Sequence, residues 1–428
     1  MRPPVDAKGL LPGSEPIPAG GRKIAVVDLL FGWPPHGGAP RDLYEVFRQA
    51  AKSHHVRFIL PALHDVITRG RLDVLLPYEA QLIRCVPEDY RDSVIGEKLK
   101  AAVDEFEPEA VFVGDGWAMK PVVARALAPY RPVVRFYAYE VACFRGAGEL
   151  FRDGKPCPDS WLKTLSKQDH RRCMECCLEY FVKDNPRESF FRKELIQSGA
   201  FEAGYPDFVA ETLAGAGALV CYNRTMAGIL GRHNPNTHVV TSGVDLEAFV
   251  PVAPEEVAPG QILFAGRVYD AKKGFSWAIE ACDLLWSRGA RFRLFTTGVG
   301  RPVEREYLDN VGWIADDARL AGLMARSAVC LVPSLWPEAL GMTALEAMAS
   351  GRPLVASRTG GLGELFTDGR QGYYVEPGDV AGLADVLGQL LDNPERGHAL
   401  GRAGRELAEA SYGWPGIVRD RIMPLLFP

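Results

Sequence analysis

The sequence predicts an α/β protein built from two successive domains, each with a parallel sheet. Two observations carry this prediction. The 428 residues are too many for one ordinary hydrophobic core. Short apolar runs also alternate with helical stretches in two series, one opening at Lys23 and the other near Gln261. Parallel strands need crossover connections, usually helices, so the alternation favours two parallel sheets with a cleft between their carboxyl edges.

The first series predicts a domain over residues 22–250. A tail rich in proline and glycine, residues 1–21, precedes this domain and is predicted to be disordered. Residues 145–200 break the rhythm with cysteines and charges, and we interpret them as a helical insertion. Within the domain, strands are expected at 23–28, 56–60, 110–113 and 133–137, and helices at 41–52 and 120–127.

The second series predicts a domain over residues 251–410, followed by a C-terminal segment, 411–428. The proline-containing stretch 251–260 has few large apolar residues and is the expected linker. Strands are expected at 262–265, 292–296, 329–332 and 354–356, and helices at 276–286, 318–325, 343–349, 380–391 and 396–410.

Composition argues against several classes of protein. The net charge of −5, from 49 basic and 54 acidic residues, gives no support for a protein that coats nucleic acid. No apolar run approaches the roughly 18 residues that span a bilayer. The first 20 residues lack the apolar core of a secretion signal. We therefore expect a cytoplasmic protein, with peripheral contact to the inner face of the membrane still open.

The nine cysteines fit a reducing compartment, and five of them fall in or beside the predicted insertion. Cys173 and Cys176 have the spacing of metal ligands, and Cys157 could add a third thiolate. Three interpretations stay open: free thiols, a structural zinc, and a disulfide or redox role. We favour free thiols.

Glu338 and Glu346 stand where the strand expected at 329–332 leads into a helix. In an open α/β sheet such a place binds phosphate, because free N–H groups and the helix dipole point at the anion. Carboxylates would repel phosphate, so hydroxyl groups are their expected partners. A shared proton-transfer role is disfavoured, because one glutamate lies in the loop and the other one to two turns into the helix. The alternative is two unrelated surface acids.

Arg267, Lys272 and Lys273 follow the strand expected at 262–265. A strand end that delivers these cations to a cleft suits a diphosphate, which Arg binds as a fork and Lys as a point charge. The alternative is a basic, solvent-exposed loop. Gly37 and Gly38 precede a helix and would let the backbone approach a ligand closely, although Gly-Gly is also a common turn.

In combination these motifs resemble the family 4 retaining glycosyltransferases, which have the GT-B fold of two Rossmann-like domains facing across a cleft. The resemblance covers roughly residues 23–416 and is more specific in the second half. It is carried by Pro35-His36-Gly37-Gly38-Ala39, Ser242-Gly243-Val244-Asp245 with Phe249, Gly266-Arg267 with Lys273-Gly274, Pro333-Ser334, the Glu-x7-Glu unit, Gly360-Gly361 with Glu364, and Asp368-Gly369 to Gly372.

The resemblance implies a retaining enzyme that moves a hexose-type sugar from a nucleotide-diphospho-sugar donor held by the second domain. Glu338 would hold sugar hydroxyls and Glu346 the ribose hydroxyls. The backbone between them would meet the sugar and the diphosphate, at Leu340, Gly341, Met342 and Thr343.

The resemblance also implies how the donor is activated. Arg267 and Lys273 would stabilise the charge growing on the leaving diphosphate, with Lys272 as the other eligible lysine. Gly37 and Gly38 would close over the donor from the first domain. No catalytic metal or cofactor is expected, and no protein nucleophile, because the departing phosphate would take the acceptor proton. The acceptor stays open among glycans, lipid-linked glycans and small molecules. Segment 411–428 is expected to pack back on the first domain.

Some positions depart from the family pattern. Tyr137 stands where family members commonly carry a histidine, and His36 could compensate. In the insertion, Trp161, Phe190 and Phe191 could face a lipid or a membrane surface, but we favour the alternative, an ordinary amphipathic helix that covers the core. Two alternative functions follow: a catalytically silent GT-B relative that binds glycan or nucleotide, and a GT-B sugar-nucleotide epimerase or hydrolase.

Overall fold

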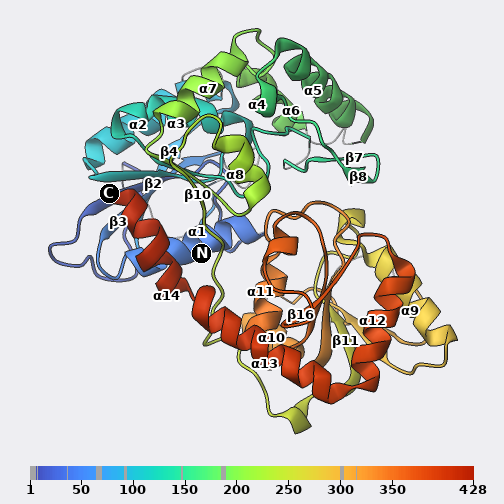
Figure 1. Cartoon of the computed structure of the whole chain (residues 1–428). Helices are drawn as coiled ribbons and strands as arrows, with labels where there is room; N and C mark the ends of the chain where they lie inside the picture. Colours follow the sequence, from blue (N-terminus) through green and yellow to red (C-terminus); the bar gives the residue numbers. More distant parts are fainter. Residues whose placement is uncertain are drawn as a thin grey trace. The chain divides into compact units, whose positions relative to one another are not determined.

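The structure is a computed structural model that describes residues 6, 8–35, 37–63, 70–90, 94–145, 148–184, 189–298, 303–314 and 316–428. The chain divides into two compact units. The first comprises Met1–Leu150, Cys157–Val240 and Val418–Pro428, and the second comprises Phe151–Pro156 and Thr241–Ile417. Each unit is a sheet with helices packed on it (Figure 1).

The sheet of the first unit is parallel except at one edge, where β1 runs antiparallel to β4. Its strand order reverses between β2 and β5, which are parallel neighbours. Along the sheet the strands are β1 (Leu10–Leu11), β4 (Glu79–Arg84), β3 (His55–Ala62), β2 (Lys23–Val27), β5 (Ala110–Val113), β6 (Val133–Arg135), β9 (Ala218–Cys221) and β10 (Thr237–Val239).

Helices cover both faces of this sheet. Apolar residues recur every three or four positions on α1 (Gly38–Ala50), where Leu43, Val46 and Phe47 are buried. On the face opposite α1, α2 (Val94–Phe106) packs on α3 (Lys120–Ala126), and α3 on α7 (Tyr205–Gly215) (Figure 1). The connection from β9 to β10 contains α8 (Arg224–Leu230).

The predicted insertion is largely helical, with α4 (Trp161–Thr164), α5 (Lys167–Glu179) and α6 (Ser189–Gln197) after a short hairpin of β7 (Phe151–Arg152) and β8 (Lys155–Pro156). At Trp161 the structure supports the favoured interpretation, a helix that covers the core, and not contact with a lipid. The Trp161 side chain is fully buried and stacks on Phe144 in the core of the first unit. The side chains of Phe190 and Phe191 lie outside the described part of the structure.

The sheet of the second unit is parallel throughout and has the doubly wound order, with the reversal between β11 and β14. Helices α9 and α12 pack together, as do α11 and α13, on opposite sides of the sheet (Figure 1). The strands in order are β13 (Leu308–Asn310), β12 (Arg293–Thr296), β11 (Ala258–Phe264), β14 (Ser327–Val332), β15 (Leu354–Ser357) and β16 (Gly372–Val375). The helices are α9 (Phe275–Ser287), α10 (Asp317–Ala325), α11 (Met342–Ala349), α12 (Val380–Asp392), α13 (Pro394–Ser411) and α14 (Trp414–Ile417).

The structure corrects four boundaries. Leu10 and Leu11 of the predicted disordered tail form β1, because their backbone pairs with β4. The first unit ends at Val240 rather than at 250, since Val244 bonds to the Tyr412 carbonyl and Gly243 packs on Trp414 within the second unit. The second unit extends to Ile417 rather than 410. Part of the expected linker belongs to β11, which begins at Ala258.

Candidate functional site

The main candidate site lies in the second unit, where β11 and β14 are neighbours and the strand order reverses. Ile262 pairs with Val329 and Leu263 with Cys330, so the two strands end side by side. The loop after β11 carries Arg267 and Lys273, and the loop after β14 carries Glu338. Ligands of open α/β sheets bind outside the carboxyl ends of strands at such a reversal.

One backbone hydrogen bond and one close contact at a glycine hold the two loops together. The Leu335 amide donates to the Lys272 carbonyl at 2.8 Å. Gly274 has φ +74°, and a Cβ added there would lie 1.8 Å from the Pro333 carbonyl oxygen. Only glycine fits this close approach in the left-handed region. These two contacts bring the side chain of Lys273, the residue before Gly274, to Glu338.

Lys273 and Glu338 form a close ion pair. Lys273 Nζ lies 2.6 Å from Glu338 Oε1, and the carboxylate is 7% exposed. Burial alone would raise the pKa of Glu338, but the Lys273 ammonium, with hydrogen bonds from Lys273 and Ser334, holds this pKa below its usual range. The site therefore keeps a buried carboxylate ionised, as a hydroxyl-binding role requires.

The backbone around Glu338 is fixed by a second loop. The Gly361 amide donates to the Glu338 carbonyl at 2.7 Å, and Gly360 packs so closely that a Cβ would lie 2.3 Å from that oxygen. Gly341, at φ +99°, begins α11, and no described side chain caps this helix end. The first N–H groups of α11 therefore remain suited to an oxyanion.

The other residues expected at this site differ in exposure. Leu340 is buried, whereas Met342, Thr343 and Glu346 are partly exposed on the first turns of α11. The Arg267 side chain is 49% exposed and pairs with Asp270 at 3.1 Å.

A cavity of about 460 Å³ lies in the same unit beside the Arg267 loop. The Thr296 hydroxyl is buried and has no hydrogen-bond partner among the described residues. Prediction from sequence missed this cavity, because its walls come from three strand ends and two loops. The lining residues are Val268, Phe275, Thr296, Val303, Glu304, Arg305, Glu306, Leu308 and Asn310.

In the first unit, Gly37 and Gly38 are exposed at the start of α1, and His36 lies outside the described residues. Sequence reasoning missed Asp28, at the reversal between β2 and β5. Its carboxylate accepts from the amides of Leu30, Phe31 and Asp115 at 2.6–2.8 Å. Burial, with the charge of Asp115, raises the pKa of Asp28 to about 7. An acid directly after a buried strand was the signal available in the sequence.

Tyr137, at the position of the family histidine, is buried. Its amide donates to Glu140 Oε1 at 2.8 Å, and its hydroxyl has no hydrogen-bond partner in the described part of the chain. Beside it, Arg135 and Asp42 form a fully buried ion pair at 3.0 Å. Lys120 and Glu140 form another at 2.6 Å. These pairs keep four charged side chains inside the first unit.

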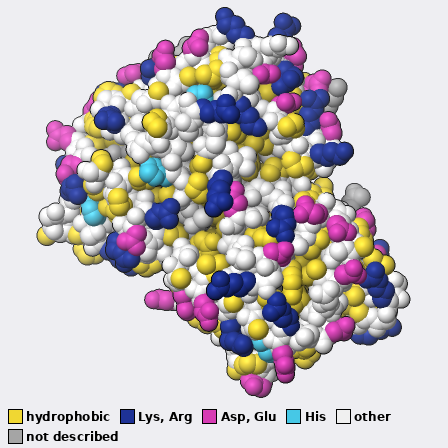
Figure 2. Space-filling view, in the orientation of Figure 1, with side chains coloured by type: hydrophobic (Ala, Val, Ile, Leu, Met, Phe, Trp, Pro, Cys, Tyr) yellow, Lys and Arg dark blue, Asp and Glu magenta, His cyan; other side chains and the backbone are white. Residues whose placement is uncertain are grey.

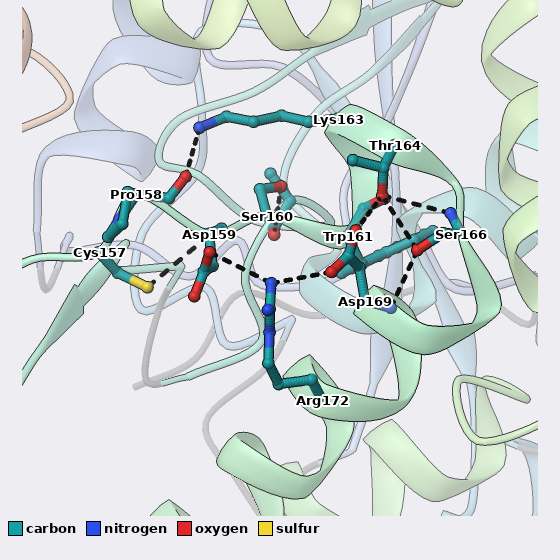
Figure 3. Close-up of polar contacts among 11 residues, drawn as sticks. Cys157, Pro158, Asp159, Ser160, Trp161, Lys163, Thr164, Ser166, Asp169 and Arg172 are labelled. Atoms are coloured by element: carbon teal, nitrogen blue, oxygen red, sulfur yellow. Dashed lines mark hydrogen bonds and ion pairs between the residues drawn. The ribbon is translucent and has the colours of Figure 1, made fainter.

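The cysteines near the insertion are all free thiols. Burial raises the pKa of Cys143 to about 12 and that of Cys173 to about 11, so both are protonated. Figure 3 shows how the Cys157 loop is tied to α5: Arg172 bridges Asp159 and Asp169 at 3.2 and 2.9 Å. Among the described residues, no group of three or more potential ligands is arranged to hold a metal ion.

The surface and the helices add two observations. On the face drawn in Figure 2, basic and acidic side chains are interspersed over both units. Within the described ranges, no helix combines the length and the apolar character needed to cross a membrane.

A family model matches part of the second unit. Residues 259–393 match the family model described as Glycosyl transferases group 1. The MMP alpha-(1->4)-mannosyltransferase of Mycolicibacterium hassiacum is 34% identical over 196 residues, which cover 43% of this chain and 47% of that protein. The glycogen synthase of Mycobacterium tuberculosis is 31% identical over 199 residues, covering 42% and 45%. The chain spans about half the length of these curated relatives.

Solved structures resemble the chain over nearly its whole length. Sucrose-phosphate synthase from Thermosynechococcus elongatus aligns with a TM-score of 0.62 and 18% identity, covering 93% of this chain and 96% of that one. Anabaena HepE in complex with UDP aligns with a TM-score of 0.61 and 14% identity, covering 93% and 97%. The fold is GT-B. The predicted fold class is thereby confirmed, and in this GT-B protein the group 1 match falls on the unit that carries Lys273 and Glu338.

Proposed function

We propose that this GT-B protein is a glycosyltransferase that moves a sugar from a nucleotide-diphospho-sugar donor to an acceptor. The Lys273–Glu338 pair carries the proposal, because it sits at the strand reversal inside the segment that matches Glycosyl transferases group 1. The names of the relatives, a mannosyltransferase and a glycogen synthase, support the reaction class. The UDP complex of HepE supports a nucleotide ligand.

In this proposal the donor lies along the start of α11. Glu338 accepts hydrogen bonds from the sugar hydroxyls, and Glu346 accepts them from the ribose. The uncapped first turn of α11 supports an oxyanion between these acids. That places the diphosphate and the sugar against the backbone of Leu340, Gly341, Met342 and Thr343.

Arg267 and Lys273 stabilise the leaving diphosphate. The bond between the sugar and the diphosphate breaks while the acceptor oxygen bonds to the same sugar carbon. The departing phosphate takes the acceptor proton, so the step needs no protein nucleophile and no metal, and attack on the front face retains configuration. Activity that survives a chelator would support the metal-free step.

The cavity beside Val268 supports a nucleoside ligand. Its volume of about 460 Å³ falls within the usual range for small-molecule sites. Val268, Phe275 and Leu308 offer apolar walls, and the unpartnered Thr296 hydroxyl offers a polar contact.

In this proposal the first unit binds the acceptor. Gly37 and Gly38 approach the donor, and the acceptor is a glycan, a lipid-linked glycan or a small molecule. We also propose peripheral contact with a membrane through the insertion, since Val182 and Ile196 are exposed there at 63% and 55%. Co-sedimentation with anionic vesicles tests this contact, with Val182→Ser as the weakened variant.

The deciding experiment is a thermal-shift screen against UDP-, GDP-, ADP- and dTDP-glucose. A donor at about 100 times its Kd should add about 2.7 kcal/mol to the free energy of unfolding. Glu346→Ala should lose most of the nucleotide affinity if Glu346 holds the ribose, and unchanged affinity by calorimetry would refute that role. Product analysis follows: free monosaccharide alone, with every acceptor tried, would favour a hydrolase over a transferase.

A further inference from the structure

Glu338 has a second buried partner in the loop after β14. Ser334 stands four residues before it, is 1% exposed, and donates its hydroxyl to Glu338 Oε1 at 2.6 Å. Lys273 Nζ binds the same oxygen at 2.6 Å. Two short bonds therefore converge on Oε1, while Oε2 takes part in neither of them.

Trp336 completes the surroundings of this pair. Lys273 Nζ lies 5.5 Å from the centre of the Trp336 ring, within the range of a cation–π contact. The ring also faces Lys272, whose Nζ lies 6.0 Å from the same centre. Arg267, the third cation of the site, pairs with Asp270. The Glu338 carboxylate is thus bound by one cation, Lys273, and by one neutral hydroxyl, that of Ser334.

We propose that Ser334 is a positioning residue that fixes the Glu338 carboxylate so that Oε2 is presented to the donor sugar. The inference rests on the proposed function, in which Lys273 also meets the diphosphate. A lysine ammonium has three donors and one charge, so a bound diphosphate competes with Glu338 for it. Ser334 is neutral, so its bond to Oε1 survives that competition.

This role differs from simple packing in what it predicts for pH. A hydrogen bond to an ionised carboxylate lowers the carboxyl pKa, so removing Ser334 Oγ should raise the pKa of Glu338. A carboxyl with a depressed folded pKa stabilises the protein above its unfolded pKa, and this contribution is lost as the pH falls. In Ser334→Ala the contribution should be smaller and its loss should be complete at a higher pH, because the folded pKa of Glu338 lies closer to the unfolded value.

The first test needs no ligand. Thermal midpoints of the full chain are measured between about pH 3.5 and pH 6 for wild type, Ser334→Ala and Ser334→Thr. Ser350→Ala is the matched control, because Ser350 is also fully buried in this unit and its hydroxyl has no partner among the described residues. On acidification Ser334→Ala should lose less stability than wild type and should complete that loss at a higher pH, Ser334→Thr should restore the wild-type profile, and Ser350→Ala should run parallel to wild type.

The second test uses UDP-, GDP-, ADP- and dTDP-glucose and the matching nucleotide diphosphates. Ser334→Ala should bind the diphosphate with wild-type affinity but turn the sugar nucleotide over about tenfold more slowly, with the acid limb of its pH profile moved upward. Profiles that match Ser350→Ala in both tests would overturn the positioning role. Failure of wild type to bind any of these nucleotides would count against the donor proposal instead, and the ligand-free profiles would still decide the Ser334–Glu338 contact.

Discussion

Burial determines the protonation state of single residues in the site and their contribution to stability. A carboxylate as enclosed as Glu338 would normally take up a proton, because desolvation penalises the charged form. Lys273 and Ser334 offset that penalty by binding the same oxygen at 2.6 Å. The Arg267 side chain is 49% exposed and pairs with Asp270, so it contributes less to folding. The two cations of the site should therefore respond differently to mutation.

Lys273→Met and Arg267→Ala separate these contributions. Both should raise the barrier to sugar transfer by about 2–4 kcal/mol if both cations stabilise the leaving diphosphate. Only Lys273→Met should also lower the thermal midpoint near neutral pH, because it leaves Glu338 buried and unpaired. That deficit should shrink in acid, where Glu338 is protonated. Steady-state kinetics and calorimetric melting check the pair, and equal melting losses would contradict this division.

Asp28 should make the first unit less stable as the pH rises. Its pKa is raised to about 7, so its stabilising contribution is complete below the unfolded value and is lost as the pH climbs through 7. Relative to Asp28→Asn, wild type should lose stability between about pH 4 and pH 7. Asp115→Asn is the control: it removes the neighbouring negative charge and should reduce the loss. Parallel melting profiles for wild type and Asp28→Asn would rule out the effect.

At the scale of elements, the site is made by two strand-to-helix loops held in contact. The β11 loop is held by the backbone hydrogen bond from Leu335 to Lys272 and by the close approach at Gly274. Without these two contacts it would be an ordinary basic turn that carries lysines. The β14 loop is held on its other side by Gly360 and Gly361. These glycines allow the loops to approach closely, and the close approach fixes the position of the charged side chains.

Gly274→Ala should therefore damage both stability and function. The added Cβ would lie 1.8 Å from the Pro333 oxygen, so the loops must separate and Lys273 must move away from Glu338. Gly289→Ala is the matched control, because Gly289 also has a positive φ, +96°, but has nothing within 4 Å of its Cβ position. The control should lose about 1 kcal/mol of unfolding free energy in urea, and Gly274→Ala clearly more. Similar losses of unfolding free energy in the two variants would show that the two loops can separate at little cost.

At the scale of the whole molecule, the chain ends in the unit where it began. Val418–Pro428 belongs to the first unit, although residues 241–417 before it belong to the second. Phe427 stacks on His54 at 5.3 Å between ring centres, and the Arg22 guanidinium lies 3.8 Å from the Phe427 ring. Arg421 donates to the Val239 carbonyl at 3.0 Å. The C-terminal residues therefore stabilise the N-terminal unit.

Phe427→Ala should destabilise the first unit selectively. Loss of the two ring contacts should cost about 1–3 kcal/mol. Hydrogen exchange should quicken in β5, which contacts the last helix, Met423–Leu426, and should stay unchanged in β14 of the second unit. Ile17→Ala, at a side chain 52% exposed in the same unit, serves as the control. Faster exchange in both units would mean that the effect spreads beyond the first.

The local sequence pattern was enough to determine the two α/β series, the helical insertion and the loops with Arg267, Lys273 and Glu338. Each of these depends on features of neighbouring residues: the alternation of strands and helices, the glycines, and the charges at strand ends. Only the tertiary structure decided that Lys273 meets Glu338, that Ser334 shares its oxygen, and that Gly274 touches Pro333. It also paired Leu10 and Leu11 with β4 and buried Trp161. Most of these contacts join residues distant in sequence, and the strength of the polar ones depends on desolvation, which exists only once the chain has packed.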